Sequence, residues 1–291
     1  MKLGAIEAGG TKFVCAVSDD NIKIEDREQF PTTTPEETMA QVFAYFEQHP
    51  VDAIGIGSFG PVSLNEDADD YGHITNTPKL AWKNYNFLGA MKAHFDIPFY
   101  FTTDVNVAAY GEYKAGAGRG KKNILYWTVG TGVGASYIQH GKFLQGYSHP
   151  EMGHILLRPD ERDNGFKGVC PYHGNCFEGL AAGLSIEKRF GKKGYEIDPS
   201  DEFWEIEAKY IAQACVNATL ILRPDIIIFG GGVMKQSQLF PQIQAEFVKQ
   251  LADYVDFPEI TGYIKHVALG DDAGITGALM LAKKALQEIK N

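Results

Sequence analysis

One short pattern occurs twice in this chain, and it restricts the possible folds more than any other feature. An apolar run over Leu3–Ala8 ends in a turn with the sequence Gly-Gly-Thr-Lys (residues 9–12), and a second apolar run follows. Near the middle, an apolar run over Ile124–Val129 ends in Gly-Thr-Gly (130–132) and again leads into a second run. Such runs around glycine predict strand–turn–strand units. The repetition indicates an internally duplicated α/β protein; the alternative is two unrelated hairpins with glycine in their turns.

The segments between and after these units alternate helical and strand patterns. Thr34-Pro35-Glu36-Glu37 offers a capping oxygen, a proline at the first helical position and acidic residues in the first turn, so it predicts a helix to about Gln48. Apolar periodicity predicts further helices over 87–94, 105–115, 179–190, 202–222, 239–254 and 275–289. Further strands are predicted over 22–30, 53–57, 98–101, 133–138 and 226–229, and residues 62–84 are predicted to be a polar loop.

The glycine-rich segment Gly116–Gly120 is the clearest linker in the sequence. A chain of 291 residues is long enough for two domains. We therefore expect a smaller α/β domain over 1–116, joined by the C-terminal helix at about 275–291. A larger α/β domain is expected over 117–274.

Composition excludes several classes of partner. The formal net charge of −10 argues against binding to nucleic acid or to an anionic membrane surface. A phosphate-bearing ligand would have to be held by local devices such as backbone amides and a metal cation. Four cysteines do not make a disulfide scaffold in a chain of this length, and Cys15 and Cys215 lie in apolar runs typical of buried positions. No 18-residue apolar run or secretion signal pattern is present, so we expect a cytoplasmic location.

The segment from His154 to Cys176 carries a candidate metal site. Cys170, His173 and Cys176 are closely spaced, and His154 lies upstream across a polar loop. Two thiolates and two imidazoles are ligands that tetrahedral Zn²⁺ prefers, and four protein ligands make such a site structural. The alternative is a chance cluster of surface histidines with ordinary cysteines.

Three glycine-rich turns each follow an apolar strand, at residues 9–12, 130–134 and 230–232. Glycine lets backbone amides approach an anion, and threonine adds a hydroxyl donor. None of the three has the P-loop or dinucleotide fingerprint. Together they favour a triphosphate held between two domains, and a helix after Gly232 could place its N-terminal amides on the nucleotide. The small residues Ala181–Gly183 and Ala273-Gly274 would admit an adenine, or they serve helix packing.

Asp104 follows the strand predicted over 98–101, at the edge of the presumed interdomain cleft. A carboxylate in this position can accept the proton of a substrate hydroxyl that attacks a γ-phosphate. The alternative is a helix cap, in which Asp104 satisfies the free amides of the following helix.

Taken together and in order, these motifs resemble those of the ROK family (repressors, open reading frames, kinases) and, within it, the bacterial zinc-containing fructokinases. The motifs are Glu7–Lys12, Thr103–Glu112, Gly130–Gly134, Glu151–His154 and Cys170–Glu178. The resemblance spans essentially the whole chain. It implies a duplicated actin-like, ribonuclease-H-like ATPase fold with two domains and an interdomain cleft. It also implies transfer of the ATP γ-phosphate to a sugar hydroxyl with Mg²⁺, and a homodimer.

The same resemblance implies roles for individual residues. Asp104 would be the catalytic base, and the sugar would be bound by Glu151, His154, Glu178 and Asn76. His154 would also ligate the structural Zn²⁺ with Cys170, His173 and Cys176. The nucleotide and its phosphates would contact a larger set: Gly9, Gly10, Thr11, Lys12, Gly130, Thr131, Gly132, Ala182, Gly230, Gly231, Gly232 and Val233.

Three positions depart from the usual family pattern. Glu7 stands where an aspartate is usual, which changes its reach toward Mg²⁺ or water. His173 replaces a cysteine of the zinc motif, and Thr103 replaces the asparagine that commonly precedes the catalytic aspartate. All three resemble features of the fructokinase branch. The repressor branch carries an N-terminal helix-turn-helix domain, and because this sequence starts on the first strand we expect none here.

The sequence therefore predicts an ATP-dependent fructokinase that forms fructose 6-phosphate. The alternatives are a ROK kinase acting on mannose or glucose, and a non-catalytic sugar sensor. A sensor needs no base, so Asp104 beside three phosphate-type turns argues against it. A structural zinc protein without a ligand would leave those turns unexplained.

Overall fold

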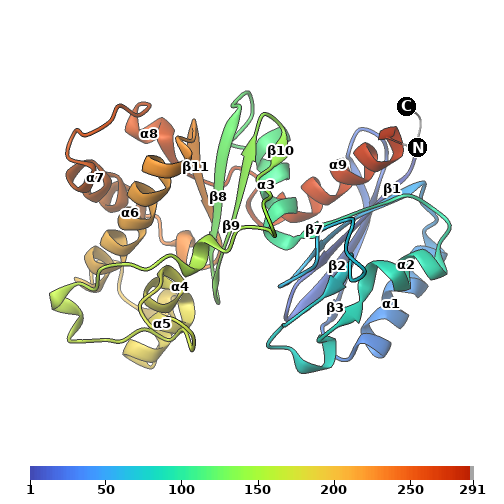
Figure 1. The fold of residues 1–291 in the computed structure, drawn as a ribbon, viewed down its shortest axis with the longest axis horizontal. Coiled ribbons are helices and arrows are strands. Elements are labelled where there is room, and N and C mark those ends of the chain that lie inside the picture. The colour runs from blue at the N-terminus through green and yellow to red at the C-terminus, as the bar shows by residue number, and fades with distance from the viewer. Residues whose placement is uncertain (289–291) are drawn as a thin grey trace. The chain divides into compact units, whose positions relative to one another are not determined.

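The computed structural model describes residues 1–288, which divide into two compact units (Figure 1). Unit 1 comprises Met1–Gly116, Gln145–His149 and the C-terminal segment from Leu269. Unit 2 comprises Ala117–Leu144 and Pro150–Ala268. The division after Gly116 falls in the glycine-rich segment. The C-terminal helix was predicted to reach residue 289 and its domain to reach residue 291. Residues 289–291 lie outside the described part of the chain.

Unit 1 is built on a five-stranded mixed sheet with the order β3-β2-β1-β4-β7. Strands β1 (Leu3–Ala8), β2 (Lys12–Ser18) and β3 (Ile24–Pro31) are antiparallel, whereas β4 (Ala53–Ser58) and β7 (Phe99–Thr103) continue the sheet in parallel with β1. Parallel strands are buried on both faces, which explains why β1 is apolar up to Glu7 and β4 is apolar up to Ser58. The polar side chains of these two strands therefore lie near their carboxyl ends.

Helices cover both faces of this sheet. Helices α1 (Pro35–Gln48) and α2 (Phe87–His94) pack on the face that carries Ile54 and Ile56, around the buried Trp82. Helices α3 (Asp104–Ala115) and α9 (Ala273–Glu288) lie on the other face (Figure 1). Successive side chains of a strand point to opposite faces, so Gly55 is the residue of β4 that faces α9.

Close backbone approach explains the small residues of α9. A Cβ atom at Gly55 would lie 1.9 Å from the carbonyl oxygen of Ala278, and one at Gly277 would lie 1.7 Å from the carbonyl oxygen of Val107 in α3. A Cβ at Gly111 of α3 would similarly lie 2.2 Å from the carbonyl oxygen of Ala273. The packing explanation of the small residues near 273–277 is thus supported by the contacts.

Unit 2 repeats the sheet plan of unit 1 with the order β10-β9-β8-β11-β12. Strands β8 (Asn123–Val129), β9 (Val133–Gln139) and β10 (Lys142–Phe143) are antiparallel, and β11 (Ile226–Gly230) and β12 (Ile264–His266) run parallel to β8. The matching strand order confirms the predicted duplication and excludes two unrelated hairpins.

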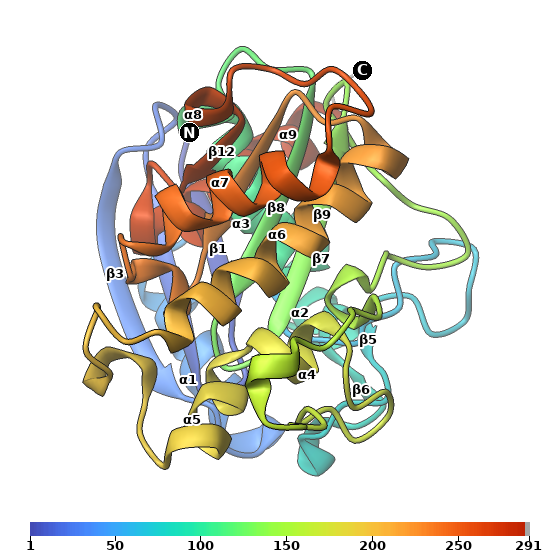
Figure 2. The ribbon, with the colours of Figure 1, turned by 90° about the vertical axis from the view of Figure 1, so that its left-hand side faces the viewer.

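The helices of unit 2 are α4 (Phe177–Ala181), α5 (Gly183–Phe190), α6 (Phe203–Leu222), α7 (Leu239–Leu251) and α8 (Ile260–Tyr263). Helices α6 and α7 lie against one face of the sheet (Figure 2), where Trp127, Phe229 and Trp204 form part of one buried core. No helix within residues 1–288 is long and apolar enough to cross a membrane.

Several predicted elements differ from the structure. The helix predicted over 179–190 is two helices, because Ala182 adopts an extended conformation (φ −69°, ψ 159°) between α4 and α5. The helix predicted to reach 254 ends at Leu251, since Ala252 and Asp253 take left-handed conformations with φ of 52° and 54°. A small hairpin of β5 (His73–Ile74) and β6 (Tyr85–Asn86) lies at the segment predicted to be loop.

Candidate active site and metal centre

The four predicted metal ligands come together in unit 2. His154 ends a short 3₁₀ turn over Met152–His154, and Cys176 is the N-cap residue of α4. The candidate ligand atoms of His154, Cys170, His173 and Cys176 all lie within 4.8 Å of one another. Both cysteines are buried, whereas His173 is exposed. These side chains could hold one metal ion.

The distances between pairs of these nitrogen and sulfur atoms match the separation of two ligands bound to the same tetrahedral ion. The Nδ1 atom of His154 lies 3.7 Å from Sγ of Cys170 and 3.6 Å from Sγ of Cys176. The Nδ1 atom of His173 lies 3.7 Å from Sγ of Cys170. Bonds of roughly 2.3 Å to sulfur and 2.0–2.1 Å to nitrogen at tetrahedral angles would separate such ligands by about 3.6 Å. The geometry also makes Nδ1 the metal-facing nitrogen of His154 and leaves its Nε2 for a different partner.

The Cys176 thiol has a raised pKa. Burial, opposed by the hydrogen bond from the Gly179 N–H and reinforced by the neighbouring Cys170, raises the pKa of this thiol to about 11. Because thiolates are the metal-binding form, binding of an ion releases protons from this cluster.

Glu178 connects the metal segment to the second phosphate-type turn. Its Oε2 atom accepts a hydrogen bond of 3.0 Å from the backbone N–H of Val133, which follows the Gly130–Gly132 turn. No sequence pattern indicates this contact, because residues 133 and 178 are far apart in the chain. The predicted sugar ligand Glu151 is exposed and precedes the Met152–His154 turn.

Asp104 is the first residue of α3, directly after the end of β7. The N cap is the preceding residue, Thr103, whose hydroxyl accepts a hydrogen bond of 3.1 Å from the N–H of Asn106. One oxygen of Asp104 accepts a hydrogen bond of 2.8 Å from the N–H of Val105. The contribution of Asp104 to helix capping is therefore secondary to that of Thr103, and its carboxylate is held at the carboxyl end of a parallel strand, where α/β proteins bind ligands.

Glu7 belongs to the same electrostatic environment as Asp104. It lies near the end of β1, half-buried, and a Cβ atom at Gly274 would lie 2.6 Å from its carboxyl carbon. Burial and, second, the negative charge of Asp104 raise the pKa of Glu7 to about 7, against the opposing effect of Arg27. The structure thus places two interacting carboxylates in unit 1, and the Glu7 carboxylate packs against Gly274 of α9.

The three glycine turns have different backbone arrangements. In the first, the N–H of Gly9 donates to the carbonyl oxygen of Lys12 at 2.9 Å. In the second, the N–H of Gly130 donates to the carbonyl oxygen of Gly132 at 2.9 Å, and the N–H of Gly183 donates to that of Gly130 at 2.7 Å. The third is followed only by a 3₁₀ turn over Val233–Lys235. Helix α7 begins at Leu239, where the sequence predicted it, and the 3₁₀ turn lies between it and the glycines.

The remaining predicted residues are distributed over both units. Asn76 is exposed in a bend of unit 1 that follows β5. Ala182 and Val233 are buried in unit 2. The predicted positions in unit 1 are therefore those near Glu7, Asn76 and Asp104, and those in unit 2 surround the metal cluster and the Gly130 and Gly230 turns.

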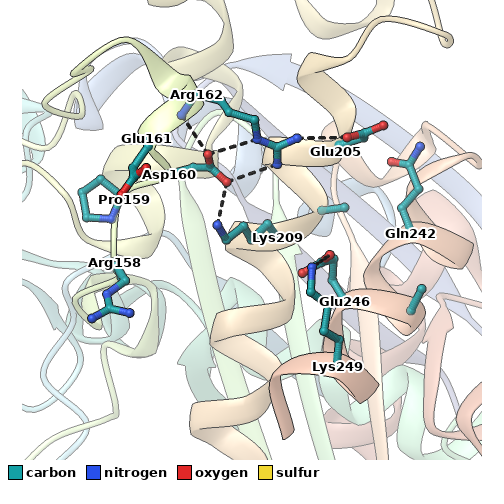
Figure 3. A pocket seen from close by; sticks show the side chains of 12 residues that line it. Arg158, Pro159, Asp160, Glu161, Arg162, Glu205, Lys209, Gln242, Glu246 and Lys249 are labelled. Atoms are coloured by element: carbon teal, nitrogen blue, oxygen red, sulfur yellow. Dashed lines mark hydrogen bonds and ion pairs between the residues drawn. The ribbon is translucent and has the colours of Figure 1, made fainter. Parts of the chain in front are cut away.

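A surface hollow of about 990 Å³ lies on unit 2 and involves none of the predicted residues (Figure 3). Within it, Asp160 accepts hydrogen bonds from Arg162 and Lys209, and Arg162 also donates to Glu205 at 3.0 Å. The Arg162 guanidinium holds the pKa of Asp160 well below its usual range. Because these charges compensate one another, the hollow is not assigned a ligand.

Comparison with known proteins supports the family suggested by the sequence. Residues 3–285 match the model of the ROK family. A fructokinase from Pediococcus pentosaceus is 52% identical over 287 residues, which cover 99% of each chain. A fructokinase from Streptococcus mutans is 48% identical over 286 residues and 97% of each chain. Among solved structures, the ROK hexokinase from Thermus thermophilus matches with a TM-score of 0.79 at 22% identity, over 99% of this chain and 100% of its own.

Proposed function

This chain belongs to the ROK family, with the actin-like ATPase fold, and from that premise we propose that it is an ATP-dependent fructokinase. It transfers the γ-phosphate of ATP to the 6-hydroxyl of D-fructose. The observation that carries this conclusion is the identity of about half of all residues to fructokinases over nearly the full length of both chains. The site residues described above supply the chemistry that the reaction requires.

Asp104 is the proposed catalytic base. Its carboxylate accepts the proton of the 6-hydroxyl as that oxygen forms a bond to the γ-phosphorus. The bond between the γ-phosphorus and the β,γ-bridging oxygen breaks, and ADP leaves. Support for this role comes from the position of Asp104 at the end of β7 and from Thr103, which already serves as the helix cap.

The proposed sugar ligands are two carboxylates, one imidazole and one amide side chain. We assign Glu151, Glu178 and the Nε2 atom of His154 to sugar hydroxyls, together with Asn76. His154 suits this role because its Nδ1 atom faces the cysteine sulfurs. The Oε1 atom of Glu178 is the acceptor we assign to the sugar, since Oε2 is bound to Val133.

Backbone amides and small polar side chains hold the nucleotide. Thr11 and Lys12 with the first two glycine turns bind the phosphates, and the third turn lies at the nucleoside. Mg²⁺ would neutralise charge on the phosphates when bound. Glu7 is the side chain that we assign to contact with Mg²⁺ or with a water molecule bound to it. The proposed contacts are Gly9, Gly10, Thr11, Lys12, Gly130, Thr131, Gly132, Ala182, Gly230, Gly231, Gly232 and Val233.

We assign Zn²⁺ to the cluster of His154, Cys170, His173 and Cys176. Two sulfur and two nitrogen donors at the observed separations suit this ion, and four protein ligands make it structural. Its function is to fix the segment that carries Glu151, His154 and Glu178. That the protein forms a homodimer and is located in the cytoplasm are predictions from the sequence.

Substrate choice is tested by ATP consumption with fructose, mannose, glucose and N-acetylmannosamine in the presence of Mg²⁺. The fructokinase proposal requires a clear preference for fructose. Preference for another hexose would retain the mechanism and change the substrate. Hexose binding without any turnover would identify a sugar sensor.

A further inference from the structure

The proposed sugar ligand Glu178 also contacts the turn that we assign to the ATP phosphates. Its Oε2 atom accepts the N–H of Val133 at 3.0 Å, and a Cβ atom at Gly132 would lie 2.6 Å from the same oxygen. A hydrogen bond to a charged acceptor is stronger than a neutral one. The Glu178 carboxylate therefore restrains the backbone of the turn over Gly130–Gly134.

Two further contacts fix the same turn to neighbouring segments. A Cβ atom at Gly153, next to His154, would lie only 2.0 Å from the carbonyl oxygen of Val133. The N–H of Gly183, just after α4, donates to the carbonyl oxygen of Gly130 at 2.7 Å. The backbone near His154 and the backbone just after α4 thus both pack closely against the turn over Gly130–Gly134.

A short covalent path leads from the metal ligands to Glu178. Cys176 is the N cap of α4, and its sulfur accepts a hydrogen bond of 3.3 Å from the N–H of Gly179. Glu178 is the second residue of this five-residue helix. A Cβ atom at Gly179 would lie 1.7 Å from the carbonyl oxygen of Gly174, so α4 also packs tightly on the loop between the two cysteines. The orientation of Glu178 consequently depends on the metal-bound loop.

We infer that Glu178 is a positioning residue for the nucleotide as well as a sugar ligand, and that the metal cluster acts on nucleotide affinity through it. The inference rests on the proposed function, because it requires that the turn over 130–134 binds phosphates. When the cluster is loaded, α4 holds Glu178 against Val133 and the turn keeps the conformation that receives the phosphates. When the cluster is empty, the turn loses this restraint before any sugar is bound.

Calorimetric titration of MgADP into the metal-loaded, sugar-free protein tests this inference. Glu178→Ala is expected to weaken MgADP binding roughly tenfold, the size of one hydrogen bond to a charged group. Glu178→Gln should weaken MgADP binding less than Glu178→Ala does, since the neutral amide oxygen can still accept the Val133 N–H, although more weakly than a carboxylate. Glu187→Ala removes an exposed carboxylate of α5 that is outside the proposed sugar and nucleotide sites and serves as the matched control, with MgADP affinity within about twofold of the wild type.

Equal MgADP affinity of wild type and Glu178→Ala would overturn the inference, as would equal losses in the Ala and Gln variants. Failure of the wild type to bind MgADP would instead contradict the proposed function. Amide hydrogen exchange on the wild type gives a readout that does not depend on the folding of a variant. Chelation should accelerate exchange in the peptide containing Gly130–Gly134, and unchanged exchange there would refute the link to the metal cluster.

Discussion

The hydroxyl of Thr103 accepts a hydrogen bond of 3.1 Å from the backbone N–H of Asn106, so Thr103 caps α3 and Asp104 occupies the first helical position. The sequence left open whether Asp104 is a cap or a base. Because Thr103 is the cap, Asp104 is not needed for that role. Its carboxylate lies at the start of α3, directly after the end of β7. This arrangement separates the structural role from the proposed chemical one.

Asp104→Asn should reduce turnover with fructose by about 10²–10⁴-fold, because the amide cannot accept the proton of the attacking hydroxyl. Fructose affinity should change little, since the base acts in the transition state. Steady-state kinetics and calorimetric fructose binding measure the two effects. The control is Thr103→Ala, which should lower the free energy of unfolding by about 1 kcal/mol through loss of the cap. Retention of full turnover by Asp104→Asn would remove this residue from catalysis.

Cys176→Ser should reduce the metal content and weaken fructose binding, because Cys176 is one of the four proposed metal ligands and also caps α4. Chelation of the wild type should have the same effects while unit 1 stays folded. Elemental analysis and fructose titration provide the measurements. In Cys215→Ala, a buried cysteine outside the cluster is changed, so the metal content should be that of the wild type. Fructose binding that is independent of the metal content would exclude the proposed role of the ion.

Gly277→Ala should lower the free energy of unfolding by about 1–3 kcal/mol or prevent folding, because its Cβ would lie 1.7 Å from the carbonyl oxygen of Val107. Helices α3 and α9 would have to separate. Gly146→Ala in the same unit is the control, since a Cβ there meets no atom within 4 Å and stability should change by less than about 0.5 kcal/mol. Denaturant unfolding compares the variants. Similar stability of both would show that α9 packs less closely than described.

The raised pKa of Glu7 predicts that stability falls as pH increases. Its folded-state pKa is about 7 and the ordinary pKa of a glutamate is 4.5, so between these values the folded protein binds more protons than the unfolded chain. The contribution of Glu7 therefore becomes less favourable from about pH 4.5 to pH 7 and is constant above that. At pH 8 without Mg²⁺, Glu7→Gln should be more stable than the wild type by about 1–3 kcal/mol.

Urea unfolding of both proteins at pH 5 and pH 8 measures this difference. The gain from Glu7→Gln should be smaller at pH 5, where most of the folded protein already carries a protonated Glu7. A substitution of the exposed Glu28 on β3 controls for the loss of one negative charge and should change stability by less than about 0.5 kcal/mol. Equal effects of Glu7→Gln at both pH values would contradict the raised pKa.

The sequence predicted most of the elements that are long or strongly patterned. The strand–turn–strand units and α1 were recognised because apolar runs, glycine turns and capping residues are local signals. The cluster of candidate metal ligands was predicted for the same reason, since three of the four lie within seven residues of one another. The duplicated fold followed from the repetition of these local patterns.

The features that were missed depend on tertiary contacts. The break at Ala182 places the N–H of Gly183 on the carbonyl oxygen of Gly130, and only the folded chain brings these groups together. Strand β12 has three residues, two of them exposed, so its sequence lacks an apolar run. The contact of Glu178 with Val133 likewise joins residues on separate elements. Such pairings are not encoded in the spacing of neighbouring residues.

The most direct test of the fructokinase assignment is incubation of the protein with ATP, Mg²⁺ and fructose, followed by identification of the products by NMR. The account predicts equal amounts of ADP and fructose 6-phosphate. Absence of ADP formation, with fructose and with the other hexoses, would contradict the assignment of this chain as a sugar kinase.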